Sequence, residues 1–424
     1  MSGTFPSTVQ VVATVLFACA VLHTFLTRKF EHLAHVYPRH SGLLHSLGEV
    51  ETVFGVWAAI LIGFMGLYLS PQDALHYLES RTFTEPAFIF AIIVIAASRP
   101  ILDLSGAILH WLARLLPIAR PNAYYFTVLF VGPLLGSFIT EPAAMTLTAM
   151  LLRERFFSRQ APRAFKYGTL GVLFVNISIG GTLTPFAAPP VLMVAERWGW
   201  DFGFMLTAFG WKAALAVLVN AAAATAYFRS YLEQMPTISA ALARLEVPWP
   251  VIAVHLAFLI GVVLTGHHIV VFAGLFLLFL GFAEAYRRYQ SRLLLREGLM
   301  VGLFLAGLVV LGGMQGWWIG PLLAELGTTT MFYGTAALTS VTDNAALTYL
   351  GSLADNISAE AKYSLVAGAV SGGGLTVIAN APNPAGFAVL KSTFDEGAIS
   401  PLGLATAAIP PTLTAMAAFQ LLPG

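Results

Sequence analysis

Long apolar runs separated by short polar stretches dominate the sequence. Runs such as VVATVLFACAVL and FAGLFLLFLGFA carry no charge over a dozen residues. A membrane-spanning helix needs about 20 apolar residues, and the short alternating strands of a membrane barrel are not seen. The pattern predicts an all-α polytopic membrane protein with about 10 transmembrane helices. The expected spans are 8–27, 48–69, 86–98 with its continuation, 167–200, 204–228, 250–266, 268–285, 298–312, 362–390 and 399–422.

Two further apolar segments are each interrupted by the same polar pattern. Segment 121–153 contains TEPAAMT at 140–146, and segment 317–353 contains TDNAALT at 342–348. Each copy places one carboxylate inside an otherwise hydrophobic stretch. Charged side chains within membrane segments are rare and usually functional, so both interruptions predict a site.

The distribution of Lys and Arg predicts which connections face the cytoplasm. The basic residues that follow or flank the spans are Arg28, Lys29, Arg39, Arg99, Arg114, Arg120, Arg153, Arg155, Arg159, Arg163, Lys166, Arg229, Arg244, Arg287, Arg288, Arg292, Arg296 and Lys391. The acidic loops 70–85 and 354–360 fall on the other side, and the N-terminus is expected outside. Segment 121–153 has basic residues at both ends, so it fits a re-entrant hairpin from the cytoplasmic side. Segment 317–353 fits the mirror arrangement.

Each half of the chain also contains a broken helix. GGTL at 180–183, followed by APP at 188–190, aligns without gaps on GGLT at 373–376, followed by APN at 381–383. Two hairpins of opposite sense, each followed by a broken helix, predict an inverted-topology repeat, in which such paired interruptions mark the binding site of a secondary transporter.

The predicted domains follow from this repeat. The first repeat is 1–228, with hairpin 121–153 and broken helix 167–200. The cytoplasmic connection is 229–249. The second repeat is 250–424, with hairpin 317–353 and broken helix 362–390.

Composition agrees with the pattern. Of 424 residues, 58% are hydrophobic and 10% charged, against about 25% charged in soluble domains. The net charge of +1 gives no indication of a nucleic-acid partner. The single cysteine, Cys19, excludes an internal disulfide.

The polar residues at the interruptions suit a small cation. Burial disfavours an ionised carboxyl group, and no Arg lies near the tips to compensate Glu141 or Asp343. A carboxylate in that setting holds either a cation or a proton, which is the minimum chemistry for exchange between them. We expect Glu141 and Asp343 to hold the transported metal cation. The neutral oxygens expected to add to them belong to Thr140, Asn176, Thr342, Asn344, Asn380 and Asn383.

Structural explanations of the same residues remain open. Thr84-Glu85-Pro86 repeats Thr140-Glu141-Pro142 at the start of the third span, so this motif also begins helices. Asp343 is also a favourable helix-capping residue. Asn380 and Asn383, beside prolines, are also typical of turns.

These hairpin and broken-helix residues resemble the sodium/proton antiporters of the ion transporter superfamily, which also holds arsenite, silicate and dicarboxylate transporters. The resemblance covers about 45–395 and is strongest at 340–390. It implies a scaffold and a transport domain containing both hairpins, in a protein that is usually homodimeric. Dicarboxylate members carry Ser-Asn-Thr at each tip. Thr-Glu-Pro and Thr-Asp-Asn depart from that pattern, which favours a cation over a carboxylate substrate.

Other polar residues have less specific interpretations. A first connection with four histidines and two acids is a possible pH-sensing or metal site, although its spacing fits no zinc pattern; these residues are His32, His35, His40, His45, Glu49 and Glu51. Lys212 in the fifth span is expected to extend towards the membrane surface, with a counter-charge role as the alternative. Asn220 is expected to form a hydrogen bond between helices.

We therefore expect a secondary active transporter that exchanges a cation, Na⁺ in the first place, for protons. The alternative is a proton- or sodium-coupled carrier of a small anion or oxyacid, such as a dicarboxylate, arsenite or silicate. An intramembrane hydrolase is disfavoured, because neither Gly-x-Gly-Asp nor His-Glu-x-x-His occurs. We expect no enzymatic activity and no cofactor beyond the transported Na⁺ and H⁺. The expected partners are the ion, the lipid bilayer and a second copy of the chain, in a bacterial inner membrane.

Overall fold

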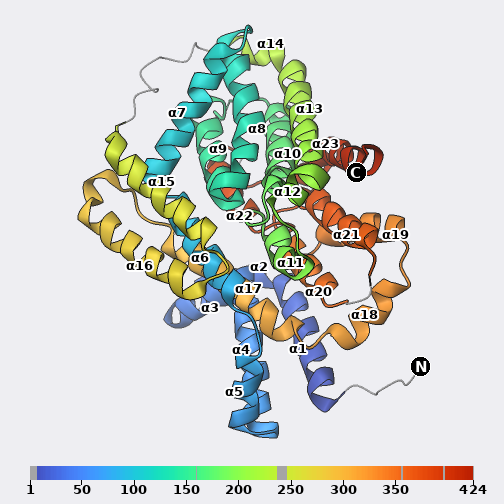
Figure 1. Ribbon diagram of the computed structural model, residues 1–424. Coiled ribbons are helices and arrows are strands. Elements are labelled where there is room, and N and C mark those ends of the chain that lie inside the picture. The colour runs from blue at the N-terminus through green and yellow to red at the C-terminus, as the bar shows by residue number, and fades with distance from the viewer. Residues whose placement is uncertain (1–6, 159, 236–245, 355–356, 395–396, 424) are drawn as a thin grey trace.

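Every regular element in the described part of the chain is helical. The computed structural model describes residues 7–158, 160–235, 246–354, 357–394 and 397–423. The α-helices in chain order are α1 (Thr8–Thr24), α2 (Thr27–Val36), α3 (Ser41–Leu47), α4 (Val50–Tyr68), α5 (Pro71–Glu79), α6 (Thr84–Ala96), α7 (Arg99–Leu115), α8 (Arg120–Ile139), α9 (Glu141–Arg155), α10 (Arg163–Gly180), α11 (Pro189–Trp198), α12 (Phe202–Met205), α13 (Trp211–Tyr227), α14 (Arg229–Leu232), α15 (Trp249–Leu264), α16 (Ile269–Ala285), α17 (Leu295–Gly312), α18 (Gly316–Ala324), α19 (Thr328–Thr339), α20 (Asn344–Ser352), α21 (Ala359–Gly372), α22 (Asn383–Leu390) and α23 (Pro401–Leu421). Figure 1 shows their arrangement.

Several helices are long and apolar enough to cross a membrane. Among the described residues five pass this test, at Glu51–Tyr68, Arg120–Ile139, Phe202–Tyr227, Leu295–Gly312 and Pro401–Leu421. A sixth span is possible if α6 and α7, bent by 65° at Ser98, are one crossing. The shorter apolar helices α1, α15 and α16 have 16 or 17 residues. The all-helical membrane class is therefore confirmed, whereas the predicted count of about 10 spans stays a prediction.

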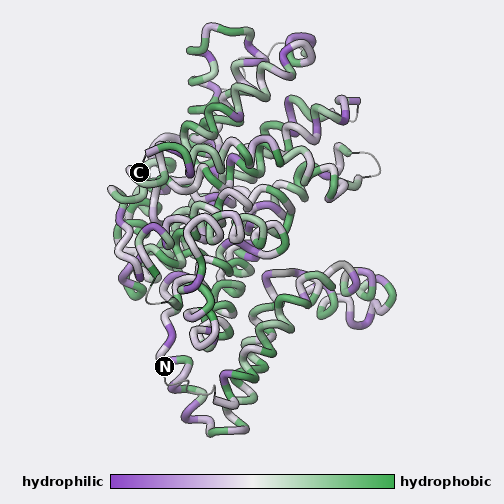
Figure 2. The backbone as a smooth tube through the Cα atoms, turned by 90° about the vertical axis from the view of Figure 1, so that its right-hand side faces the viewer, coloured by the Kyte–Doolittle hydropathy of each residue, from purple (hydrophilic) through white to green (hydrophobic). Residues whose placement is uncertain are grey.

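Basic residues at the ends of several helices form ion pairs or hydrogen bonds with neighbouring segments of the chain. Arg99 at the start of α7 pairs with Glu246, and Arg296 at the start of α17 pairs with Glu49. The Lys166 ammonium at the start of α10 donates to the Thr393 carbonyl, 2.8 Å away, beyond the end of α22. We call this end of the helices the basic side. Hydrophobic residues line the long helices in Figure 2, and hydrophilic residues gather at helix ends and connections.

The first interrupted segment is a helical hairpin. A Cβ at Gly136 would lie 3.3 Å from the Ala144 Cβ, and a Cβ at Gly132 would lie 2.3 Å from the Thr148 Cγ2. These pairs are placed symmetrically about Thr140, so α8 and α9 pack antiparallel and both have their far ends on the basic side. Glycine at these positions allows the two helices to approach closely.

The second interrupted segment differs from its predicted limits. Residues expected to begin the hairpin form a separate short helix, α18, and the interruption at Asp343 joins α19 to α20. These two helices make few contacts with each other, because α19 packs mainly on α21 and α20 mainly on α11. We keep the name second hairpin for α19 and α20. Gly327, which has extended backbone angles, separates α18 from α19. The change of direction at Asp343 is where the sequence predicts it.

Both broken helices divide at the predicted glycines. In the first half α10 ends at Gly180, and α11 begins at Pro189. In the second half α21 ends at Gly372, and α22 begins at Asn383. Proline cannot donate to the helical ladder and suits a first turn, so each break ends where the sequence supplies Pro.

A similar close approach between hairpin and broken helix occurs in the two halves, although the two glycines are one position apart in the aligned repeat. A Cβ at Gly180 of α10 would lie 2.8 Å from the carbonyl carbon of Pro133 on α8. A Cβ at Gly372 of α21 would lie 2.3 Å from the carbonyl oxygen of Ala336 on α19. The halves then exchange partners, because α9 packs against α22 and α11 packs against α20. This crossed packing brings both hairpin tips and both breaks together.

The helices α1, α4, α6, α15, α16 and α17 pack mainly on one another, whereas α13 and α23 pack on each other and on α10, and α13 also on α8. α4 contacts α17 and α1, while α6 contacts α17, α16 and α15. The closest approach is at Gly307 of α17, where a Cβ would lie 2.4 Å from the Phe54 carbonyl carbon of α4. Residues 236–245 of the polar connection 229–249 lie outside the described residues, and so do residues 355–356 of the acidic loop 354–360.

Candidate functional site

Thr140 forms the tip of the first hairpin in an unusual backbone conformation. Its φ is 72° and its ψ is 150°, a region almost restricted to glycine. It is the one non-glycine residue with positive φ among those described. Its hydroxyl does not cap α9, and Oγ1 is buried with no hydrogen-bond partner in the described part of the chain. The conformation therefore places a hydroxyl at the tip without a structural use for it.

Glu141 is fully buried at the first position of α9. Its Oε2 accepts a hydrogen bond from the Asn380 side-chain amide at 2.9 Å. Its Oε1 is buried and has no partner among the described residues. Gly181 permits this position, because a Cβ there would lie 2.4 Å from Oε1. The first carboxylate thus contacts the break of its own half and an asparagine of the other half.

Asp343 occupies the corresponding tip of the second hairpin. It is 9% exposed, and its Oδ1 accepts from the backbone N–H groups of Ala345 at 2.8 Å and Ala346 at 3.2 Å. The capping interpretation is therefore confirmed. Capping occupies Oδ1 only. The charges of Asp343 and Glu141 are close enough to interact, so capping and cation binding can both hold.

Asn344, Asn380 and Asn383 surround the second break. The Asn344 backbone N–H donates to the Ala379 carbonyl at 3.1 Å, which connects the second tip to the residue before Asn380. The Asn383 amide donates to the carbonyls of Gly373 at 2.7 Å and Thr376 at 2.8 Å. Asn383 thereby satisfies carbonyls that the broken helix releases, and its Oδ1 stays without a partner among the described residues.

The tips and breaks share one property, which is buried oxygen atoms without hydrogen-bond donors. Within the described residues these atoms are Thr140 Oγ1, Glu141 Oε1, Asn344 Oδ1, Asn380 Oδ1 and Asn383 Oδ1. The Asn344 side-chain nitrogen, a donor, is also buried without a partner among these residues. A buried polar atom without a partner costs about 1–3 kcal/mol. Carboxylate and neutral oxygens are the ligands of hard cations. The described residues contain no group of three or more His, Cys, Asp or Glu side chains that could hold a metal, so any cation here would be bound largely by neutral oxygens.

Asn176 and Thr342, which were also predicted as site residues, differ in their surroundings from the residues described above. The Asn176 amide donates to the Leu129 carbonyl at 2.9 Å, and its Oδ1 accepts from Asn220 at 2.9 Å. Asn220 also donates to the Pro411 carbonyl at 3.2 Å, so its predicted role between helices is confirmed. The structure therefore does not bring Asn176 to the buried oxygens. Thr342 lies at the second tip and is half-buried.

A cleft of about 940 Å³ lies on the basic side beside the second break. Val377 and Ile378 of the break line it, and so do Glu49 and Glu51 at the start of α4. Glu51 is also close enough to Asp343 for their charges to interact. The predicted acids of the first connection therefore face a cleft that approaches the hairpin tip.

The histidines of the first connection are exposed, and among the described residues no three of them are grouped so as to hold a metal ion. His32, His35, His40 and His45 lie on α2, α3 and the turn between them. The rings of His35 and His45 are 5.7 Å apart. The pH-sensing role of these residues stays a prediction.

The expectation that Lys212 extends to the membrane surface is wrong. Lys212 is 2% exposed, and its ammonium donates to the Tyr363 hydroxyl at 3.0 Å and lies 4.7 Å from the centre of that ring. An aromatic partner on α21, distant in sequence, holds the side chain inside the protein.

The sequence interpretation missed small residues that build the site. Ser137 on α8 donates to the Gly180 carbonyl at 2.7 Å and accepts from the Leu183 N–H at 2.9 Å. Its counterpart in the repeat is Thr339, whose hydroxyl is buried and unpartnered among the described residues. Both hydroxyls lie a few residues before an interruption in aligned positions, so the internal repeat carried a signal for them.

Comparison with known families identifies the family to which the chain belongs. A family model described as "Putative Na+/H+ antiporter" matches residues 8–422, nearly the whole chain. No curated protein is matched by the sequence. The matched range includes both hairpins, both broken helices and all the buried oxygens described above. The chain belongs to this antiporter family, which makes it a membrane transporter.

Proposed function

We propose that the protein exchanges Na⁺ for protons by alternating access, with Glu141 and Asp343 as the groups that bind either species. The observation that carries this proposal is the set of buried oxygens without donors at the hairpin tips and breaks. They supply one carboxylate oxygen, from Glu141, and four neutral oxygens, and the second carboxylate, Asp343, lies close enough for its charge to interact with that of Glu141. Such a set suits a hard monovalent cation better than an anion.

The coupling follows from competition for the carboxylates. A cation bound between Glu141 and Asp343 favours their ionised forms, so each binding event releases protons. When the cation leaves, the buried carboxylates take up protons again, because burial disfavours an uncompensated charge. A site that is always filled by one species or the other carries them in opposite directions.

The crossed packing of the two halves supports an alternating-access cycle. Helices α8 to α11 and α19 to α22 would form the transport domain, with two re-entrant hairpins in an inverted repeat. The helices α1, α4, α6 and α15 to α17 would form its scaffold. The cleft beside Val377 and Glu51 would admit ions from the basic side, which we assign to the cytoplasm. On this assignment the N-terminus lies outside, in a bacterial inner membrane, and the scaffold forms a homodimer.

Cation-induced pH change in everted membrane vesicles tests this function. Wild type and Asp343→Asn are compared with Na⁺, Li⁺, K⁺ and Ca²⁺ across a pH range of about 6.5–9. Asparagine caps a helix as well as aspartate does, so the variant removes the charge and keeps α20. We expect Na⁺-dependent exchange in wild type and its loss in Asp343→Asn.

The failing outcome leads to the alternative function. No exchange with any of these cations would reject the antiport proposal. Coupled uptake of a dicarboxylate, arsenite or silicate would then be measured with the same vesicles.

A further inference from the structure

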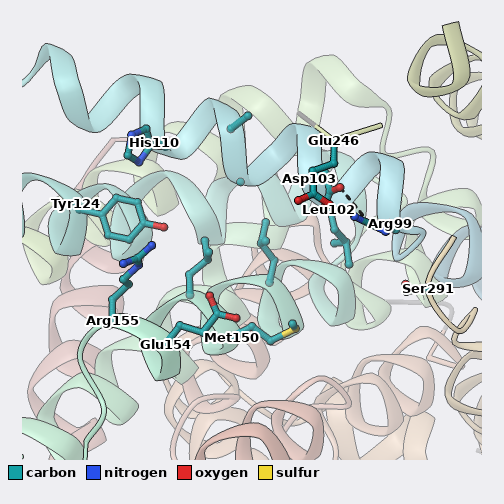
Figure 3. Close-up of a pocket in the computed structure, with 14 residues that line it drawn as sticks. Arg99, Leu102, Asp103, His110, Tyr124, Met150, Glu154, Arg155, Glu246 and Ser291 are labelled. Carbon is teal, nitrogen blue, oxygen red and sulfur yellow. Dashed lines mark hydrogen bonds and ion pairs between the residues drawn. The ribbon is translucent and has the colours of Figure 1, made fainter. Parts of the chain in front are cut away.

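A second cleft on the basic side is about 470 Å³ in volume, and Figure 3 shows the residues that line it. It is formed by α7, by α8 and α9 near their basic ends, and by the residues before α15 and α17. None of the candidate cation ligands lines it. Any function of this cleft is therefore separate from cation exchange.

One end of the cleft gathers hydrogen-bond donors from three helices. His110 of α7 is 7% exposed, and its Nε2 is buried without a partner among the described residues. Tyr124 of α8 is 5% exposed, and its hydroxyl points into the cleft in Figure 3. Arg155 of α9 extends towards Tyr124 in the same view. Arg155 forms no ion pair in the part of the chain that the structure describes.

The charge at this end is positive. Arg114, Arg120 and Arg155 all lie close enough to influence His110 electrostatically. Glu154 is the one acidic residue that lines this end in Figure 3. At the other end of the cleft Arg99 is 3.3 Å from Asp103 and also pairs with Glu246, so those charges largely compensate one another. The unpaired Arg155, beside His110 and Tyr124, is the natural position for an oxyanion.

The walls between the two ends are apolar. Leu102, Leu147, Met150 and Leu151 line the cleft. The opposite face of α7 exposes Ile108, Trp111 and Leu115, of which Trp111 is 60% exposed. An amphipathic helix with such a face lies at a membrane surface. With α7 in that position, the cleft would be at the depth of lipid head groups on the basic side, where basic pockets between helices bind anionic head groups.

We propose that this cleft binds a phosphate-bearing anion, with the phosphate held by Arg155, Tyr124 and His110. The source is either an anionic phospholipid, whose acyl chains would cover the apolar walls, or a soluble phosphate compound. Bound there, the anion connects α7 with both helices of the hairpin that carries Glu141. Binding would therefore stabilise the base of that hairpin.

Thermal unfolding of the delipidated, detergent-purified full chain tests this site. The midpoint is measured with phosphatidylglycerol, phosphatidylcholine or inorganic phosphate added. The variants are Arg155→Gln and Tyr124→Phe, and the matched control is Arg153→Gln, which removes the same charge from an exposed position of the same helix. If Arg155→Gln does not fold, Tyr124→Phe, which removes one hydroxyl, keeps the test available.

We expect the midpoint of wild type and Arg153→Gln to rise at least twice as much with the effective anion as that of Arg155→Gln or Tyr124→Phe. A rise with phosphatidylglycerol but not inorganic phosphate identifies a lipid, and a rise with inorganic phosphate identifies a soluble ligand. No rise in wild type with either, or an equal rise in all four proteins, overturns the proposal. Cation exchange by wild type is measured separately, so failure of one proposal leaves the other unaffected.

Discussion

Single residues at the hairpin tips are kept in energetically unfavourable states. Thr140 has a backbone conformation that costs about 1–3 kcal/mol. Glu141 and Asn380 each retain a buried oxygen without a donor among the described residues. Such features persist where surrounding structure enforces them and usually mark functional sites. A bound cation would supply the missing partner to these oxygens. Cation binding would therefore offset part of the free-energy cost of burying them without donors.

Substitution of Gly181 tests whether the position of the Glu141 carboxylate matters. In Gly181→Ala the new Cβ would lie 2.4 Å from Glu141 Oε1, so the carboxylate must move. We expect the apparent Na⁺ affinity in vesicle exchange assays to fall by about tenfold or more, which corresponds to about 1.4 kcal/mol. Unchanged affinity in a properly folded Gly181→Ala protein would contradict the placement of Oε1 in the site.

Two asparagine substitutions separate ligand from structural roles. Asn380→Ala removes the donor to Glu141 Oε2 and one buried oxygen. We expect it to weaken Na⁺ binding. Asn176→Ala leaves the Leu129 carbonyl and the Asn220 amide with fewer partners, so we expect it to lower stability by about 1–3 kcal/mol.

Apparent Na⁺ affinity and the thermal unfolding midpoint are measured for both variants. An affinity loss in Asn176→Ala equal to that in Asn380→Ala would show that Asn176 belongs to the cation site.

At this scale the sequence predicts residue types better than their contacts. The aligned interruptions single out Glu141, Asp343 and the asparagines, because carboxylates within apolar segments are rare. Which oxygen lacks a donor depends on side-chain positions that only packing determines. The sequence does not distinguish Asn176 from Asn380 as a candidate ligand. In the structure the Asn176 side-chain oxygen accepts a hydrogen bond from Asn220 of α13. Lys212 is buried for the same reason, because Tyr363 lies across the helix interface.

At the scale of elements, close approach between helices builds the site. Glycines at the ends of α10 and α21 allow the two broken helices to contact both hairpins. Helix breaks were predictable, because Gly-Gly and Pro interrupt the backbone ladder. The limits of the second hairpin were not, because α18 is as apolar as the hairpin and periodicity does not separate them. The packing of α9 on α22 and of α11 on α20 could not be predicted from the sequence either, because it depends on three-dimensional packing.

Gly374 tests the contact between the two broken helices. A Cβ at this position would lie 2.4 Å from the Cα of Val175 on α10, a backbone atom that cannot rotate away. We expect Gly374→Ala to lower stability by about 1–3 kcal/mol, the usual cost of overpacking, and to reduce exchange. The matched control is Gly274→Ala on α16, where no atom lies within 4 Å of the added Cβ.

Thermal unfolding midpoints of both proteins are compared with wild type. Equal midpoints for Gly374→Ala and wild type would contradict the close packing of α10 and α21.

At the scale of the whole molecule, the cleft beside the second break indicates the side from which an ion would reach the hairpin tips. It is lined by Glu49 and Glu51 of the first half and by Val377 and Ile378 of the second. Access from the basic side would correspond to one state of the proposed alternating-access cycle. In the proposed cycle the predicted internal repeat would supply the means to form the opposite state.

A cysteine at Val377 tests this access. With Cys19 replaced by Ser, the variant Val377→Cys has one thiol, located in the cleft. We expect a membrane-impermeant thiol reagent to label it from the cytoplasmic face, and saturating Na⁺ to change the labelling rate about twofold or more. A cysteine at exposed Leu43 of α3, in the first connection, is the control for Na⁺-independent labelling. Labelling of Val377→Cys from the outer face alone would contradict the assigned orientation.

The most direct test of the cation site is proton release from purified, weakly buffered protein on addition of Na⁺. Wild type is compared with Glu141→Gln and Asp343→Asn, which remove one carboxylate each and keep similar shapes. Because Na⁺ and protons compete for the same oxygens, we expect release from wild type and its loss in both variants. Equal release from all three proteins would show that protons leave another site and would contradict the central claim.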